Sequence, residues 1–222
     1  MPLEGREIVL AGGAGGLGSA TAELLGEEGA KVIVGSRSHG VRADITKAED
    51  RARLLDAAPD MYGLVVFTGT PARGGDAAIL QESFQVNFEG PILLAREAAA
   101  RMTKRGMQGA IVLLSTMQAV ALFPGSTAYA AAKAALQHSA RILAKECRGA
   151  TNIRVNVIAP GVTAAGMAEA SIASGKYDRY IHEGVIPRFG RALDIARAVR
   201  FFLEPDNYIT GQVLSVDGGI TL

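Results

Sequence analysis

The sequence predicts an α/β fold: a doubly wound, mostly parallel sheet of about seven strands with helices on both faces. Three observations lead to this prediction. Short apolar runs recur along the chain, helical patterns lie between them, and a glycine-rich turn joins the first run to the first helix. The apolar runs are continuous rather than alternating, as expected of parallel strands that are buried on both faces. Regular alternation of strands and helices is typical of such a sheet.

Six apolar, β-branched runs are the expected strands, and a weaker seventh follows the second of them. They span residues 7–12, 31–35, 63–67, 110–115, 153–158 and 212–216, with the weak strand at 40–45. Helical patterns lie near 17–28, 47–57, 82–104, 128–147 and 194–203. The gap before the weak strand is too short for the helix that normally joins parallel neighbours. We therefore expect a shortened version of the fold.

The whole chain, 1–222, is expected to form one domain. It contains no linker, repeat or low-complexity block, and 49% hydrophobic and 20% charged residues are typical of a globular protein. Residues 160–190 are loop-like and include Gly166, Gly175 and Pro187. A loop-rich insertion before the last helix is a natural position for a substrate lid.

Charge and cysteine content exclude several classes of function. The formal net charge is +1, so no surface for nucleic acid or for a membrane is expected. The single Cys147 excludes an internal disulfide framework and fits a reducing compartment. The N-terminus lacks the pattern of a secretory signal, and no apolar run approaches the ~20 residues of a membrane span. These observations favour a cytoplasmic protein that acts on a small molecule.

The turn AGGAGGLGSA follows the first strand and opens the first helix. It contains G-x-G-x-x-G at Gly13, Gly15 and Gly18, and also G-x-x-x-G-x-G at Gly12, Gly16 and Gly18. Either pattern lets the backbone approach a pyrophosphate at a helix N-terminus. The position between a strand and a helix makes this a strong prediction of a dinucleotide site.

Three further residues narrow the choice of nucleotide. Ser19 stands where a P-loop requires lysine, so a P-loop is excluded. The second strand ends in Ser36 and Arg37, where an NAD-binding protein normally has a carboxylate. No acid is present to repel a 2′-phosphate, and a guanidinium is available to bind it. The expected cofactor is NADP, with NAD as the alternative.

Tyr129 and Lys133 form the only Tyr-x-x-x-Lys pair in the chain, within an alanine-rich helix. The spacing places both on one helix face. A free phenol has a pKa near ~10 and is a poor acid–base catalyst at neutral pH, but a neighbouring ammonium favours the phenolate and lowers that pKa. Such a phenol is a candidate to exchange a proton with a carbonyl oxygen or an alcohol. Alone, the pair also fits an ordinary surface helix.

Together these motifs resemble the short-chain dehydrogenase/reductase family over nearly the whole chain. The resemblance rests on Gly12, Gly16, Gly18, Tyr129 and Lys133 and on four segments: VNFEG (86–90), VNVIAPG (155–161), RFGRALDIA (188–196) and ITGQVLSVDGG (209–219).

The family resemblance implies roles for individual residues. Tyr129 would be the general acid–base, and Lys133 would hold the nicotinamide ribose and lower the tyrosine pKa. Asn87 would support a water-linked proton relay, and Asp44 would contact the adenine amino group. The residues implied in cofactor binding are Gly12, Gly16, Leu17, Gly18, Ser36, Arg37, Asp44, Lys133, Pro160, Gly161 and Thr163.

The family's catalytic serine lies thirteen residues before the tyrosine, and here that position holds Thr116. A threonine hydroxyl can donate the same hydrogen bond to a substrate oxygen. The adjacent Ser115 is the alternative.

Two further departures from the family pattern bear on cofactor affinity. VFTG (66–69) replaces the family's Asn-Asn-Ala-Gly, with Thr68 as a partial substitute, and Ala165 replaces a threonine, which leaves Thr163 nearby.

The function expected from these residues is an NADP-dependent oxidoreductase that transfers a hydride between nicotinamide and a carbonyl or alcohol. The alternative is a dinucleotide-binding regulatory module with weak or no catalysis. A serine hydrolase is excluded because no G-x-S-x-G motif occurs and the three histidines have no identifiable nucleophile partner. One cysteine and unpaired histidines give no expectation of a metal site.

The sequence does not define the substrate, although residues 160–190 contain candidates to contact it. Met167 and Ile172 are candidates for an apolar pocket, and Lys176, Arg179 and His182 for an anion site, or else for solvent-exposed charges. A homotetramer or homodimer is also expected, because the first half of the helix at 128–147 is small or apolar nearly all round.

Overall fold

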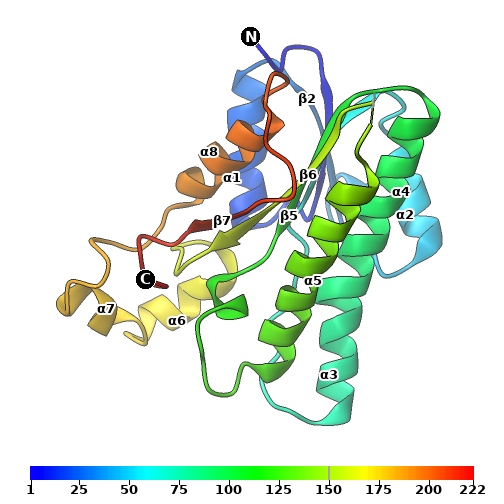
Figure 1. Ribbon diagram of the computed structural model, residues 1–222. Helices are drawn as coiled ribbons and strands as arrows, with labels where there is room; N and C mark the ends of the chain where they lie inside the picture. Colours follow the sequence, from blue (N-terminus) through cyan, green and yellow to red (C-terminus); the bar gives the residue numbers. More distant parts are fainter. Residues whose placement is uncertain (150) are drawn as a thin grey trace.

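The computed structural model describes residues 1–149 and 151–222. Within these ranges seven strands form one parallel sheet in the order β3-β2-β1-β4-β5-β6-β7 (Figure 1). The predicted fold class is therefore confirmed. The strands are β1 (Glu7–Ala11), β2 (Lys31–Ser36), β3 (Val41–Arg42), β4 (Met61–Val66), β5 (Gly109–Leu114), β6 (Ile153–Pro160) and β7 (Val213–Val216).

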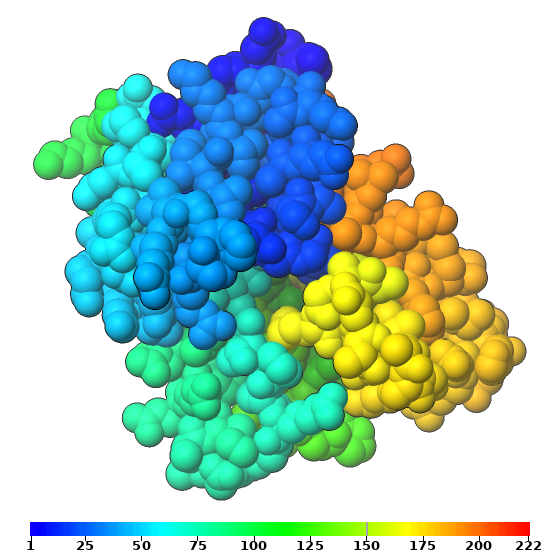
Figure 2. All heavy atoms as spheres, turned by 180° about the vertical axis from the view of Figure 1, so that it is seen from behind, coloured from blue at the N-terminus to red at the C-terminus, as the bar shows by residue number. Residues whose placement is uncertain are grey.

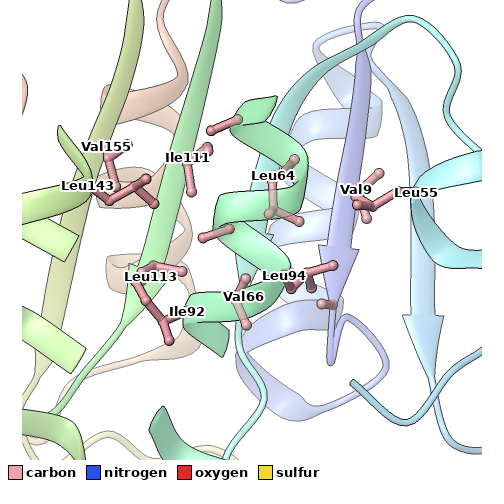
Figure 3. Packing of buried hydrophobic residues seen from close by; sticks show 14 of the residues in the cluster. Val9, Leu55, Leu64, Val66, Ile92, Leu94, Ile111, Leu113, Leu143 and Val155 are labelled. Carbon is pink, nitrogen blue, oxygen red and sulfur yellow. The ribbon is translucent and has the colours of Figure 1, made fainter. Parts of the chain in front are cut away.

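Two layers of helices cover the sheet (Figure 1). Helices α1 (Gly16–Glu27) and α8 (Ala192–Leu203) contact each other and pack on one face, where they contribute Leu25 and Val199 to the core. The other face is covered by α2 (Ala48–Asp56), α4 (Gly90–Lys104) and α5 (Thr127–Glu146). Figure 3 shows how Leu94 of α4 and Leu143 of α5 pack against the central strands.

Burial differs between the central strands and the edges of the sheet. All residues of β4, β5 and β6 are buried, as continuous apolar runs predict. The prediction is wrong for β2, where Gly35 is the one buried residue, and for β7, where Val213 and Leu214 are each 37% exposed. A strand at the end of the sheet has a neighbour on one side only, so its apolar composition alone does not give its burial.

The single helix predicted at 82–104 is interrupted. Helix α3 (Ala77–Phe84) begins earlier, with the Asp76 side chain accepting the N–H of Ile79. A π-helical turn (Gln85–Glu89) then joins it to α4, and the Gly90 N–H bonds to the Gln85 carbonyl five residues back. Pro91 has no N–H to give to the carbonyl of Asn87, so the regular α-helical ladder cannot continue there.

The connection between β2 and β3 contains only residues 37–40, and no helix. Parallel neighbours usually need a crossover of about a dozen residues. Here the Ser36 hydroxyl accepts the N–H groups of Ser38 and His39 and donates to the His39 carbonyl, which closes a tight loop. Gly40 has φ +67°, and a Cβ at this position would lie 2.1 Å from the Val34 carbonyl oxygen. The expected shortening of the fold is confirmed at this point.

Three short helical pieces follow β6 before α8 begins. They are a 3₁₀ turn (Gly166–Ala168), α6 (Glu169–Ala173) and α7 (Asp178–His182). A 3₁₀ turn (Met117–Ala119) also lies between β5 and α5. Among the described residues, no helix is both long and apolar enough to cross a membrane.

Candidate active site

A cavity of about 1190 Å³ lies at the carboxyl ends of the strands. The chain crosses from β3 on one side of β1 to β4 on the other, and ligands in open α/β sheets bind where the strand order reverses in this way. Figure 2 shows the hollow between the N-terminal part of the molecule, the residues near 75–85 and the yellow segment near 165–175. The predicted site residues that line this cavity are Gly12, Gly16, Leu17, Gly18, Ser36, Arg37, Asp44, Thr116, Tyr129, Lys133, Pro160, Gly161 and Thr163.

The glycine-rich loop favours one of its two possible patterns. A Cβ on Gly12 would lie 2.9 Å from the Thr68 nitrogen, and one on Gly16 would lie 2.9 Å from the Gly166 nitrogen. A Cβ on Gly18 would lie 2.5 Å from the Gly13 Cα. Gly15, in contrast, would place its Cβ 3.5 Å from the nearest atom, an ordinary contact. Gly13 is also crowded, since its Cβ would lie 2.8 Å from that of Leu10, so it is the open position of Gly15 that favours the spacing of Gly12, Gly16 and Gly18.

The N-terminus of α1 is suited to bind an anion. Its N-cap is Gly15, which offers no side-chain acceptor to the first turn. The N–H groups of Gly16, Leu17 and Gly18 thus have no partner inside the helix, and these residues line the cavity. Unpaired N–H groups and the positive end of the helix dipole both favour a phosphate group at this position.

Polar groups at the ends of β2 and β3 form the far end of the cavity. Arg37 is exposed and makes no hydrogen bond or ion pair with the described residues. The Asp44 carboxylate accepts the N–H and the hydroxyl of Thr46 through Oδ1, which leaves its second oxygen available. Ser36 is less available, because its hydroxyl is bound within the short loop.

Thr116 and Tyr129 are brought together by the turn between β5 and α5. Thr116 caps the 3₁₀ turn, with its Oγ1 accepting the Gln118 N–H at 3.3 Å. Burial raises the pKa of the Tyr129 phenol to about 12, and a hydrogen bond with the Thr116 side chain opposes this rise. The direction is opposite to the one expected from a neighbouring ammonium, because Lys133 does not contribute to this shift.

Ser115 also lines the cavity, but its hydroxyl is bound to α5. Its hydroxyl donates to the Lys133 carbonyl at 3.2 Å and accepts the Gln137 amide at 2.9 Å. Both of its hydrogen-bonding roles are therefore filled by the helix behind it. Of the two adjacent hydroxyls, only the one on Thr116 is paired with the phenol.

Lys133 is a buried cation without a carboxylate partner. Its side chain is 2% exposed, and its Nζ donates to the carbonyls of Leu114 at 2.8 Å and Thr68 at 3.4 Å. Burial lowers the pKa of this amine to about 7. Nζ has three donors, so one remains for a group in the cavity.

Asn87 does not line the cavity; it lies behind the cavity wall. Its side chain is fully buried, and its amide accepts the N–H of Thr70 and donates to the carbonyl of the same residue, both at 3.0 Å. Its Nδ2 also donates to the Ser83 hydroxyl. This paired contact fixes the backbone after β4, next to Gly69 and Lys133.

The two departures from the family pattern have clear structural consequences. Thr68 makes no side-chain hydrogen bond to residues 1–149 or 151–222, so it does not replace the bracing amide; the loop is instead held by Asn87. The Thr163 hydroxyl donates to the Gly161 carbonyl, and Ala165 lines the cavity beside Gly16.

Several lining residues escaped sequence reasoning because they lie on loops of no regular pattern. Ile172 and His182, which were candidates, do not line the cavity, whereas Met167, Lys176 and Arg179 do. The residues missed in the sequence include Met117, Gln118, Phe123, Tyr177 and Tyr180. Met117, Gln118 and Phe123 could have been predicted to line the site, because they lie close to Thr116 in the sequence.

Comparison with known proteins places this geometry in a family. The family described as enoyl-(acyl carrier protein) reductase matches residues 36–221. Carbonyl reductase family member 4 of Danio rerio is 32% identical, with 98% of each chain covered. NADPH-dependent aldehyde reductase 2 of Arabidopsis thaliana is 30% identical over 99% of this chain and 95% of the relative. The structure of a short-chain type dehydrogenase/reductase from Mycobacterium ulcerans superposes with a TM-score of 0.90 at 26% identity, over 100% of this chain and 91% of that one.

The chain belongs to the short-chain dehydrogenase/reductase family. It is an oxidoreductase of the kind that acts on carbonyl and alcohol groups. The alignment with the Danio rerio protein spans 241 positions, more than the 222 residues of this chain, so this member lacks residues that its relative has. The four-residue connection between β2 and β3 is one place where a helix is absent from this chain.

Proposed function

We propose that the protein is an NADP(H)-dependent carbonyl reductase or alcohol dehydrogenase with Tyr129 as its acid–base. The observation that carries the proposal is that Tyr129, Thr116 and Lys133 line the same cavity as the uncapped N-terminus of α1. A regulatory module would need the nucleotide site but not a phenol paired with a second hydroxyl. The NADPH-dependent aldehyde reductase of Arabidopsis thaliana supports the choice of cofactor.

The described residues fit a dinucleotide along the whole cavity. The N–H groups of Gly16, Leu17 and Gly18 would bind the pyrophosphate. Asp44 would accept the adenine amino group, and Arg37 would bind the 2′-phosphate of the adenosine ribose. The free donor of Lys133 would bind the nicotinamide ribose, and Pro160, Gly161 and Thr163 would form the wall beside the nicotinamide.

Bound NADPH would supply a hydride to the carbonyl carbon of the substrate. The Tyr129 phenol would give its proton to the carbonyl oxygen as the alcohol forms, and would remove that proton in the reverse direction. The Thr116 hydroxyl, already paired with the phenol, would donate a hydrogen bond to the same oxygen. Asn87 would hold the loop that carries one carbonyl partner of Lys133, and so keep the lysine placed for the ribose.

We also propose that residues 160–190 act as the substrate lid of a single-domain enzyme. This segment starts at Pro160 on the wall of the cavity, and Gly166 lies against Gly16 of the nucleotide loop. The general test of the proposal is the oxidation of NADPH by the purified protein with a panel of aldehydes and ketones. No oxidation with any of them, under conditions in which NADPH binds, would favour the regulatory module.

Thr116→Ala should lower turnover without unfolding the protein, because it removes the hydroxyl paired with the phenol. Loss of one such donor typically costs about 10²–10³-fold in kcat. Ser115→Ala is the matched control. It should leave turnover near the parent value but lower the free energy of unfolding by about 1 kcal/mol or more, since the hydrogen bonds to the Lys133 carbonyl and from the Gln137 amide are lost. Kinetics and urea denaturation of both variants are the measurements. If Ser115→Ala loses most of its turnover, the assignment of the active hydroxyl to Thr116 is wrong.

Ser36→Asp combined with Arg37→Ile should weaken NADPH binding and spare or improve NADH binding. The change removes the guanidinium and places a carboxylate next to the adenosine ribose. We expect a loss of about ten-fold or more in NADPH affinity. The loop should survive, because an aspartate can still accept the Ser38 and His39 N–H groups that Ser36 accepts now. Titration of parent and variant with both reduced cofactors is the measurement, and a parent that binds NADH at least as tightly as NADPH contradicts the assignment.

A further inference from the structure

Two cations of the proposed lid face the cavity that contains Tyr129. Lys176 precedes α7 and Arg179 lies within it, and both line the cavity together with the phenol. Both side chains are exposed, and neither forms an ion pair with the described residues. They are therefore available to a negatively charged group inside the cavity.

Tyrosine rings hold both cations in place. The Lys176 Nζ lies 5.3 Å from the centre of the Tyr177 ring, and the Arg179 guanidinium carbon lies 4.8 Å from that of Tyr180. An Arg179 Nη2 also donates to the Tyr180 hydroxyl at 3.0 Å. A cation stacked on an aromatic ring is already ordered, so binding of an anion costs less side-chain entropy.

The same tyrosines anchor the cations beside the catalytic groups. Tyr177 is 8% exposed and packs in one cluster with Met117, which directly follows Thr116 in the chain. Tyr180 and Phe123 extend this cluster. The positive charges therefore lie near the end of the cavity where the carbonyl group would be bound, and away from Arg37 at the β2 end.

The charged groups around this end of the cavity are mostly positive. Arg73, on the loop after β4, also lines the cavity and makes no ion pair with the described residues. Glu82 of α3 is a carboxylate that lines the same cavity. Asp178 lies between the two lid cations in the sequence and Glu183 follows them; Glu183 acts electrostatically on Arg179, but neither acid lines the cavity.

We propose that Lys176 and Arg179 form an anion subsite, and that the substrate is an aldehyde or ketone that also carries an anionic group such as a carboxylate. The inference rests on the proposed function, since it places the anion beside the carbonyl-binding end of the same site. Met117, Phe123 and Met167 would contact the apolar part of such a molecule between its two polar ends.

The test compares 4-formylbenzoate with its uncharged methyl ester. Each is titrated into the enzyme saturated with NADP⁺, so that binding is measured without turnover. We expect the parent to bind the carboxylate about ten-fold or more tightly than the ester, a preference that added salt should reduce. The variant Lys176→Met/Arg179→Met should bind both compounds with similar affinity.

A matched variant controls for total charge. Lys104→Met/Arg148→Met removes the same two kinds of cation from exposed positions near the C-terminal ends of α4 and α5 and should keep the parent's preference. The subsite is overturned if the parent binds both compounds equally, if the lid variant keeps the preference, or if the control loses it too. Failure of the proposed function would appear separately, as an absence of NADPH oxidation in the turnover assay.

Discussion

Replacement of Tyr129 with Phe should lower turnover by about 10²–10⁴-fold, the contribution typical of a positioned acid–base group. The phenylalanine keeps the ring and its packing but removes the proton that the carbonyl oxygen needs. NADPH affinity should change little, because the groups proposed to bind the pyrophosphate and the adenosine lie elsewhere in the cavity. Steady-state kinetics on a substrate that the parent reduces, with a parallel NADPH titration, are the measurements.

Tyr208→Phe is the matched control for this prediction. Tyr208 is fully exposed and does not line the cavity, so the same chemical change there should leave turnover unaltered. If Tyr129→Phe also retains the parent's turnover, Tyr129 is not the acid–base and the proposed mechanism is wrong. Loss of activity together with loss of NADPH binding would instead indicate a structural defect.

Lys133→Met should harm both turnover and cofactor affinity without unfolding the protein. Methionine has nearly the same length, so it fills the buried position while removing the charge and all three donors. The buried ammonium has no carboxylate partner, and an apolar side chain avoids its desolvation. This gain offsets the loss of the bonds to the Leu114 and Thr68 carbonyls. We therefore expect a melting temperature close to that of the parent, measured by calorimetry, together with a weak and slow enzyme.

The pH dependence of stability gives an independent measure of the same lysine. Its pKa is about 7 in the folded protein and near its ordinary value of 10.5 in the unfolded chain. Between these values the unfolded chain holds one more proton, so the free energy of unfolding should rise with pH, by up to about 1.36 kcal/mol per pH unit. The raised pKa of Tyr129 makes the free energy of unfolding fall with pH, but only above the ordinary phenol pKa of 10. Urea denaturation between pH 7 and 9.5 should therefore show a rise in the parent that is absent from Lys133→Met; equal slopes would show that Lys133 is charged in the folded protein.

The sequence determined the fold class because the relevant signals are local. Continuous apolar runs marked β4, β5 and β6, and the glycines at 12, 16 and 18 marked the turn into α1. The short gap after β2 correctly predicted a connection without a helix. The break near Asn87 was missed although Pro91 was visible, because the effect of a missing N–H falls on a carbonyl one turn earlier.

The sequence could also name Tyr129 and Lys133, because their spacing places them on one helix face, and it could name Thr116 through the family resemblance. Only the tertiary structure favours Thr116 over Ser115 as the proposed active hydroxyl, because the Lys133 carbonyl and the Gln137 amide take up the serine hydroxyl. The sequence also could not show how deeply the Tyr129 phenol and the Lys133 amine are buried. The pKa of a phenol or an amine depends on burial, and burial arises from segments distant in the chain that pack around it.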